Sequence, residues 1–200
     1  LSQPAKGFGG TAFAHYDGRV GPKLRQELVK TADELLAFQQ ADGSVNGDYT
    51  NFPVANGVMQ ATAQAIVTWR QVYERTADER WLVPMRKAER YVRDSAMRMS
   101  DGSLRSLYDA NYAVIGLVSA GGGASDKALA TLVRAIVKKA RGDGGFGFGG
   151  TQGSSAFMTG QTLYALRLVG VPDGNAVVRS GTRWLIAHQR QDGGWGASGS

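Results

Sequence analysis

Cysteine is absent from this sequence of 200 residues, and its absence removes several kinds of chemistry. Without a thiol the chain can form no disulfide, no thiolate metal site and no cysteine nucleophile. Long apolar runs are also missing, since none approaches the roughly 20 residues that a membrane span needs. We therefore expect no bound metal, no cofactor and no membrane span.

Strand patterns are missing as well, because no segment alternates apolar and polar residues for long enough to form a sheet. Proline is scarce, at 5 residues, whereas glycine, at 28, is about twice as frequent as usual. The glycines follow no Gly-X-Y period and gather between apolar segments, which indicates turns between helices. We predict one all-α domain over residues 1–200, with an irregular glycine-rich segment at 1–22.

The chain carries a formal charge of +6, which raises the question of a nucleic-acid partner. Its basic residues are spread along expected helix faces, and no nucleic-acid-binding motif accompanies them. Solvated helix faces explain the charge, so we expect no nucleic-acid partner. The sequence leaves the oligomeric state and the compartment open, and an exported location stays possible because the chain starts without an initiator Met.

An Asp-Gly pair with an apolar residue two places after the Gly occurs four times. The four corners span 39–45, 99–104, 142–146 and 189–195. Their pairs are Asp42-Gly43, Asp101-Gly102, Asp143-Gly144 and Asp192-Gly193, and the apolar residues include Val45, Phe146 and Trp195. The aspartates stand 59, 42 and 49 residues apart, a spacing that suits one helical hairpin per repeat. We interpret them as turn formers, because glycine readily takes the positive φ that ends a helix.

The expected helices are of two alternating kinds. Those that end at the corners are amphipathic, with one charged face: 23–40, 78–98, 126–141 and 175–189. Those that follow the corners are richer in Ala, Gly, Tyr and Met: 54–73, 107–120 and 154–169. In a curved stack of hairpins, the first kind suits an outer layer and the second an inner layer. The beginnings of the inner helices would then gather at one mouth.

A pocket at this mouth would collect polar and aromatic side chains. Its expected residues are Asp48, Tyr49, Phe52, Tyr108, Asp109, Tyr112, Phe157 and Tyr164. Asp109 is the candidate general acid or base, because burial would raise its pKa while the helix dipole would lower it. The alternative is that Asp109 caps its helix. The tyrosines are expected either to line a cavity for a carbocation or a sugar, or to pack in the core.

The fourth corner resembles a known motif. Its residues Arg179, Gly181, Trp184, Leu185, Gln189, Gly193 and Trp195 resemble the QW motif of squalene-hopene and oxidosqualene cyclases. In that family a Gln and a Trp brace neighbouring helices. The first corner keeps Gln39 and Gly43 but has Val45 at the Trp position, and the middle two lack the Gln. The resemblance implies the α/α-toroid of terpenoid cyclases and protein prenyltransferases, here as an incomplete or partner-completed ring.

The catalytic motifs of that superfamily are missing. The sequence has neither the Asp-x-Asp-Asp acid of one cyclase class, nor the Asp-Asp-x-x-Asp magnesium site of the other, nor the Cys of a prenyltransferase zinc site. We therefore expect a non-catalytic binding module whose concave face takes an apolar ligand, a glycan or a protein. One alternative is a cyclase-like isomerase that lacks its acid here. The other is a polysaccharide-active lyase or hydrolase that uses Asp48, Asp109 and the tyrosines. Whether the chain is an enzyme stays open.

Overall fold

The computed structural model describes residues 22–46, 58–99, 104, 106–123, 125–149 and 152–196, and within these ranges helices and turns form without a strand. The predicted all-α fold class is confirmed. The α-helices are α2 (Pro22–Leu36), α3 (Val58–Thr76), α4 (Leu82–Met97), α5 (Leu107–Ser119), α6 (Lys127–Val137), α7 (Ala156–Leu168) and α8 (Ala176–Ala187), and a short 3-10 turn, η1 (Glu79–Trp81), precedes α4.

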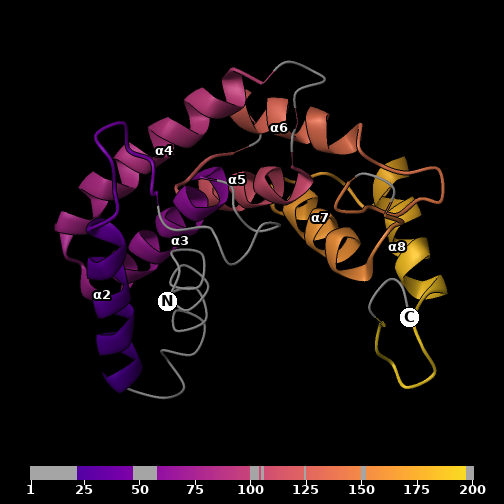
Figure 1. The fold of residues 1–200 in the computed structure, drawn as a ribbon, viewed down its shortest axis with the longest axis horizontal. Coiled ribbons are helices and arrows are strands. Elements are labelled where there is room, and N and C mark those ends of the chain that lie inside the picture. Colours follow the sequence, from indigo (N-terminus) through magenta and orange to yellow (C-terminus); the bar gives the residue numbers. More distant parts are fainter. Residues whose placement is uncertain are drawn as a thin grey trace.

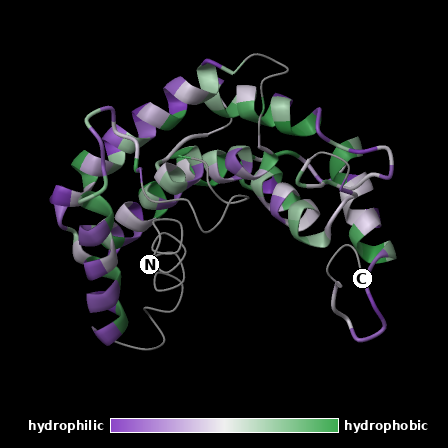
Figure 2. Ribbon diagram, viewed as in Figure 1, coloured by the Kyte–Doolittle hydropathy of each residue, from purple (hydrophilic) through white to green (hydrophobic). Residues whose placement is uncertain are grey.

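The helices form a two-layered arc. Along its inner side α3 packs against α5 and α5 against α7, while α4 and α6 pack together on the outer side (Figure 1). The legs of the arc are α2, which packs on α3, and α8, which packs on α7. This is the predicted alternation of outer and inner helices. Hydrophilic residues follow the outer sides of α2 and α4, whereas α5 is largely hydrophobic (Figure 2).

Small residues let the inner helices approach closely. A Cβ added at Gly116 of α5 would lie 2.9 Å from the backbone and side chain of Ala63 in α3, so only glycine fits there. Larger side chains fill the space between the layers, and Trp69 donates its indole N–H to the carbonyl of Ala32 in α2 at 3.1 Å. The core is therefore continuous along the arc.

The first corner connects the end of α2 to α4. Asp42 accepts hydrogen bonds from the backbone N–H and the hydroxyl of Ser44, at 2.9 and 2.7 Å. Gln39 donates to the carbonyl of Pro84 in α4 at 2.8 Å, and Gly43 lies so close to α4 that an added Cβ would be 2.3 Å from the Lys87 carbonyl oxygen. Residues 37–40, predicted as the end of the first helix, instead belong to this turn, because the corner needs them to reach α4.

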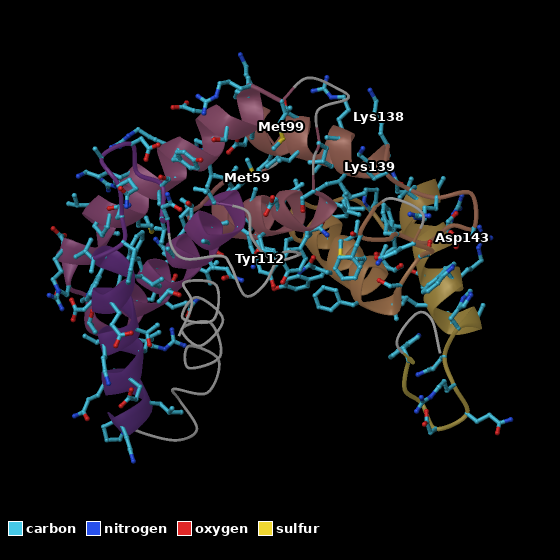
Figure 3. All side chains as sticks on the ribbon, in the orientation of Figure 1. Met59, Met99, Tyr112, Lys138, Lys139 and Asp143 are labelled. Carbon is cyan, nitrogen blue, oxygen red and sulfur yellow. The ribbon has the colours of Figure 1, made fainter. Side chains whose placement is uncertain are left out.

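The third corner repeats this arrangement with different side chains. Asp143 lies next to α8 (Figure 3). Its carboxylate accepts hydrogen bonds from the Ser154 hydroxyl at 2.8 Å and from the Trp184 indole in α8 at 3.1 Å. Gly144 has a φ of +90° and packs on the backbone of Ser180 in α8. Phe146 is fully buried. The corner therefore ties the preceding hairpin to the next outer helix.

The fourth corner has similar internal hydrogen bonds, and the described residues include no helix after it. Gln189 donates to the Gly193 carbonyl at 2.7 Å, and the Trp195 indole donates to the Leu185 carbonyl at 2.8 Å. Within the described ranges this Gln and this Trp brace their own corner and no neighbouring helix. Asp101 and Gly102 of the second corner lie outside the described residues, although Leu104 is buried.

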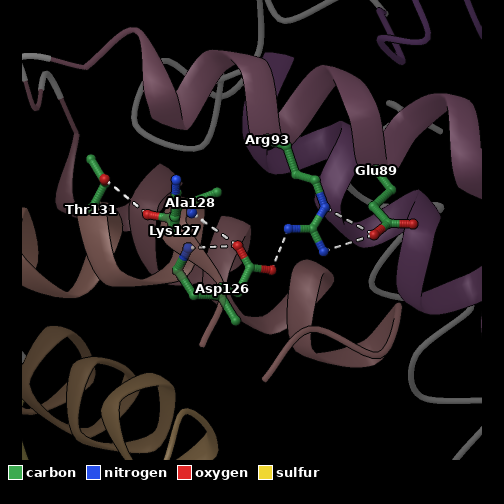
Figure 4. Close-up of polar contacts among 7 residues, drawn as sticks. Glu89, Arg93, Asp126, Lys127, Ala128 and Thr131 are labelled. Carbon is green, nitrogen blue, oxygen red and sulfur yellow. Dashed lines mark hydrogen bonds and ion pairs between the residues drawn. The ribbon is translucent and has the colours of Figure 1, made fainter. Parts of the chain in front are cut away.

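An ion-pair bridge links the two outer helices at the top of the arc. Arg93 of α4 contacts Glu89 on its own helix and Asp126 at the start of α6 (Figure 4). Asp126 also caps α6, because its carboxylate accepts from the N–H groups of Ala128 and Leu129 at 2.9 and 3.3 Å. One carboxylate thus starts a helix and fixes its position against α4.

Candidate functional site

The inner helix α5 brings three of the predicted pocket residues together. Tyr108, Asp109 and Tyr112 fall on neighbouring positions of its first turns, and Tyr112 lies on the inner side of the arc (Figure 3). Asp109 does not cap the helix, so that expectation is wrong. Ser106 is the cap, and its hydroxyl accepts the Asp109 N–H at 3.1 Å. The Asp109 side chain is therefore not used as the cap of its own helix.

Four aromatic rings gather around the start of α5. The rings of Tyr108 and Tyr112 meet edge to face with centroids 4.9 Å apart, and Phe148 and Phe157 stack in parallel at 5.8 Å. Tyr108 connects the two pairs, at 5.9 Å from Phe157 and 6.4 Å from Phe148. Phe157 is 54% exposed and Phe148 is 37% exposed, so part of this aromatic cluster is accessible to solvent.

Of the remaining predicted pocket residues, one lies away from the aromatic cluster and three lie outside the described residues. Tyr164 is exposed on α7 and makes no ring contact with the aromatic cluster in the described part of the chain. Asp48, Tyr49 and Phe52 lie outside the described residues. The structure thus brings together Tyr108, Asp109, Tyr112 and Phe157 and adds Phe148, which follows the third corner.

Buried amides from the inner helices lie beside the aromatic cluster. The side-chain amide of Asn111 donates to the Thr162 hydroxyl at 2.9 Å and to the side-chain oxygen of Gln161 at 3.3 Å. Its own side-chain oxygen has no hydrogen-bond partner within the described ranges, and neither do the amide nitrogen and oxygen of Gln60 and of Gln64. All three residues are almost fully buried. Such groups are rare, because each buried polar atom left unpaired costs about 1–3 kcal/mol.

These amides are close to Asp109 and Tyr112. The Gln60 backbone N–H contacts the Asp109 carboxylate, and the Gln64 amide is near enough to the Tyr112 hydroxyl to lower its pKa, although neither Gln64 amide atom meets hydrogen-bond geometry. Burial is the largest influence on Tyr112 and raises its pKa.

The sequence analysis did not identify Gln60, Gln64 and Asn111 as site residues. The available signal was the pair Gln60 and Gln64, which stand one helical turn apart in an alanine-rich segment.

Burial raises the pKa of Asp109 to about 6, and the Gln60 backbone N–H opposes this shift only in part. From the sequence, two opposed influences on the pKa of Asp109 were expected: desolvation would raise it, and the helix dipole would lower it. In the structure desolvation is the larger effect on this pKa, because the first turn of α5 packs against α3. Burial also raises the pKa of Tyr108, and the charge of Asp109 adds to this effect.

Replacing Asp109 by Asn should stabilise the protein at neutral pH and flatten the pH dependence of its stability. The folded-state pKa of about 6 lies above the reference value of 3.8, so the folded protein binds more protons between these values. The free energy of unfolding therefore falls as the pH rises from about 4 to about 6. We expect Asp109→Asn to gain about 1–3 kcal/mol at pH 7.5 and little at pH 4. Urea unfolding at both pH values measures this.

The matched control is Asp94→Asn on the exposed side of α4, which should change stability little at either pH. If the stability of both variants depends on pH as that of the parent chain does, the pKa of Asp109 is not raised in the folded protein. The prediction is then wrong.

The described side chains form no recognisable metal site. The described residues contain no group of three or more histidine, aspartate and glutamate side chains placed to hold a metal ion. Across the described helices, none has both the length and the apolar character that crossing a membrane requires.

Comparison with known proteins gives distant likenesses among solved structures alone. No protein-family model matches the sequence, and no curated protein matches it. Among solved structures, the fold is similar to that of a variant of the type II terpene cyclase MstE from Scytonema, in complex with its substrate geranylgeranyl dihydroxybenzoate. The TM-score is 0.42 and the identity 13%, over 98% of this chain and 71% of the cyclase chain. Because this likeness is distant, the function has to be argued from the site.

Proposed function

We propose that this chain is a helical ligand-binding module that holds a hydroxyl-rich ligand, such as a glycan, on the inner side of its arc. The observation that carries the proposal is the set of unpaired amide atoms on Gln60, Gln64 and Asn111. These atoms include both donors and acceptors, and a hydroxyl group can act as either. A ligand whose hydroxyl groups enter between the inner helices would therefore satisfy these buried atoms.

The aromatic cluster supports the same class of ligand. The exposed parts of the stacked Phe148 and Phe157 rings offer an apolar surface against which the C–H groups of a sugar ring can pack. A prenyl chain could pack on the same rings, but it has no group that can pair with a buried amide. The combination of rings with unpaired amides favours a glycan over an apolar polyene.

A binding role is favoured over catalysis by the surroundings of Asp109. Glycoside hydrolysis requires two carboxyl groups on opposite sides of the bond that is cleaved. In the described part of the chain, no second carboxylate contributes to the pKa of Asp109, whose causes are burial and one backbone N–H. The absence of a carboxylate among these causes supports binding over glycoside hydrolysis.

Calorimetric titration with chosen ligands tests the proposal. Neutral oligosaccharides, oligogalacturonates and geranylgeraniol are the probes, and chromatography of each mixture detects any turnover. We expect a neutral oligosaccharide to bind without being cleaved. Phe157→Ala should weaken this binding about tenfold or more, because it removes the exposed stacking surface, a loss of about 1.4 kcal/mol. Tyr164→Ala is the control, since it truncates an exposed ring on the same helix outside the aromatic cluster.

Two results would overturn the proposal. One is binding of geranylgeraniol in the absence of any oligosaccharide binding, which would favour the cyclase-like alternative. The other is cleavage of a bound glycan, which would show a polysaccharide-active enzyme. Equal loss of affinity in Phe157→Ala and Tyr164→Ala would place the site elsewhere.

A further inference from the structure

A buried threonine of α7 holds the third corner in place. Thr159 is fully buried, and its hydroxyl accepts the backbone N–H of Phe146 at 3.0 Å. The same hydroxyl donates to the Phe146 carbonyl oxygen at 3.3 Å, and this oxygen also accepts the backbone N–H of Ser155 at 2.8 Å. The Phe146 side chain is itself fully buried. The backbone of Phe146 is therefore fixed to the start of α7.

The same bond occurs at the first corner. Thr62 of α3 is fully buried, and its hydroxyl accepts the backbone N–H of Val45 at 2.9 Å. Val45 and Phe146 both stand two residues after the glycine of their Asp-Gly pair. The two corners differ in the residue that comes two places later, which is Gly47 in the first and Phe148 in the third. Of these two corners, only the third therefore has an aromatic residue at this position.

Phe148 is closely tied to the position of Phe146. A single residue, Gly147, separates them, and a Cβ added to it would lie 2.5 Å from a backbone carbonyl oxygen of the segment that leads into α7. The ring of Phe148 stacks in parallel on Phe157, which stands two residues before Thr159 on the same helix. Thus α7 provides one ring of the stack and also holds the backbone that leads to the other.

We propose that Thr159 is a positioning residue for the ligand site, because its hydroxyl keeps the ring of Phe148 stacked on Phe157 before a ligand arrives. An aromatic surface that is already assembled loses less conformational freedom when a ligand packs on it, so the affinity is higher. Thr159 acts through the third corner and does not touch the ligand. Its effect on binding rests on the proposed function, whereas its effect on the ring does not.

Fluorine NMR of a chain with 4-fluorophenylalanine at position 148 tests the ring position without a ligand. A stacked neighbouring ring shifts the fluorine signal, and Phe157→Ala supplies the signal of the unstacked ring. Thr159→Val replaces the hydroxyl by a methyl group, so we expect its signal to move towards that of Phe157→Ala. Thr159→Ser keeps the hydroxyl and should keep the parent signal. If Thr159→Val does not fold, Thr159→Ala removes the hydroxyl without placing a methyl group against the Phe146 backbone.

Thr62→Val is the matched control, because it removes the equivalent bond at the first corner, where no ring of the aromatic cluster follows. It should lower the thermal unfolding temperature as Thr159→Val does, yet leave the fluorine signal unchanged. In calorimetric titration with a neutral oligosaccharide, Thr159→Val should bind about threefold to tenfold more weakly than the parent chain. Thr159→Ser and Thr62→Val should bind like the parent chain.

An unchanged fluorine signal in Thr159→Val would overturn the proposal. So would a signal that Thr62→Val moves equally, or one that Thr159→Ser does not keep at the parent position. Unchanged affinity in Thr159→Val despite a moved signal would remove the role in binding. If the parent chain binds no oligosaccharide, the proposed function is wrong, and the fluorine signal still decides whether Thr159 positions Phe148.

Discussion

Gly43→Ala is expected to lower the free energy of unfolding by about 2–5 kcal/mol, the largest effect of an added methyl group among the described glycines. Two costs add at this position. An alanine at a φ of +91° is strained by about 1–2 kcal/mol. Its Cβ would also lie 2.3 Å from the Lys87 carbonyl oxygen, so α2 and α4 must separate, which costs about 1–3 kcal/mol more. Urea unfolding followed by circular dichroism measures the sum.

The control for this prediction is Gly193→Ala. Gly193 shares the positive φ but has free space around its Cβ position, so the substitution should cost only the backbone strain of about 1–2 kcal/mol. If the two substitutions destabilise equally, the first corner does not pack on α4 in solution as described.

Gln64→Met is expected to raise the free energy of unfolding by about 1–3 kcal/mol while abolishing glycan binding. The Gln64 amide is 2% exposed, and neither of its polar atoms has a hydrogen-bond partner within the described ranges. Methionine has a similar shape without a polar group to desolvate, so it should fit at no such cost. Thermal and urea unfolding give the first quantity and calorimetric titration the second. Opposite changes in stability and binding are expected where a residue is kept for its ligand.

Gln161→Met is the matched control on α7. The Gln161 side-chain oxygen accepts a hydrogen bond from Asn111, so its removal should leave a buried donor less well satisfied and destabilise the protein. Destabilisation by both substitutions would mean that Gln64 has a structural role in the core. In that case the amides would no longer support a ligand site.

Local chemistry explains which parts of this protein follow from its sequence. Helix periodicity marks the inner and outer helices. In the three Asp-Gly pairs that the structure describes, the aspartate accepts a backbone N–H while the glycine takes positive φ, so each pair forms the turn after an outer helix. The gathering of Tyr108, Asp109, Tyr112 and Phe157 also follows, because residues near the start of inner helices come together in any curved stack of hairpins. The sequence alone therefore determined the all-α class, the corners and part of the site.

Only the tertiary structure decided what each of these local features contacts. Gly43 and Gly193 follow the same Asp-Gly pattern, yet one lies against a neighbouring helix and the other against none in the described ranges. Asp109 could have had a raised or a lowered pKa until the packing of α3 on α5 fixed its desolvation. The unpaired state of Gln64 depends likewise on what surrounds it. Turns and periodicity are set within a few residues, whereas burial and pairing depend on segments that the sequence keeps far apart.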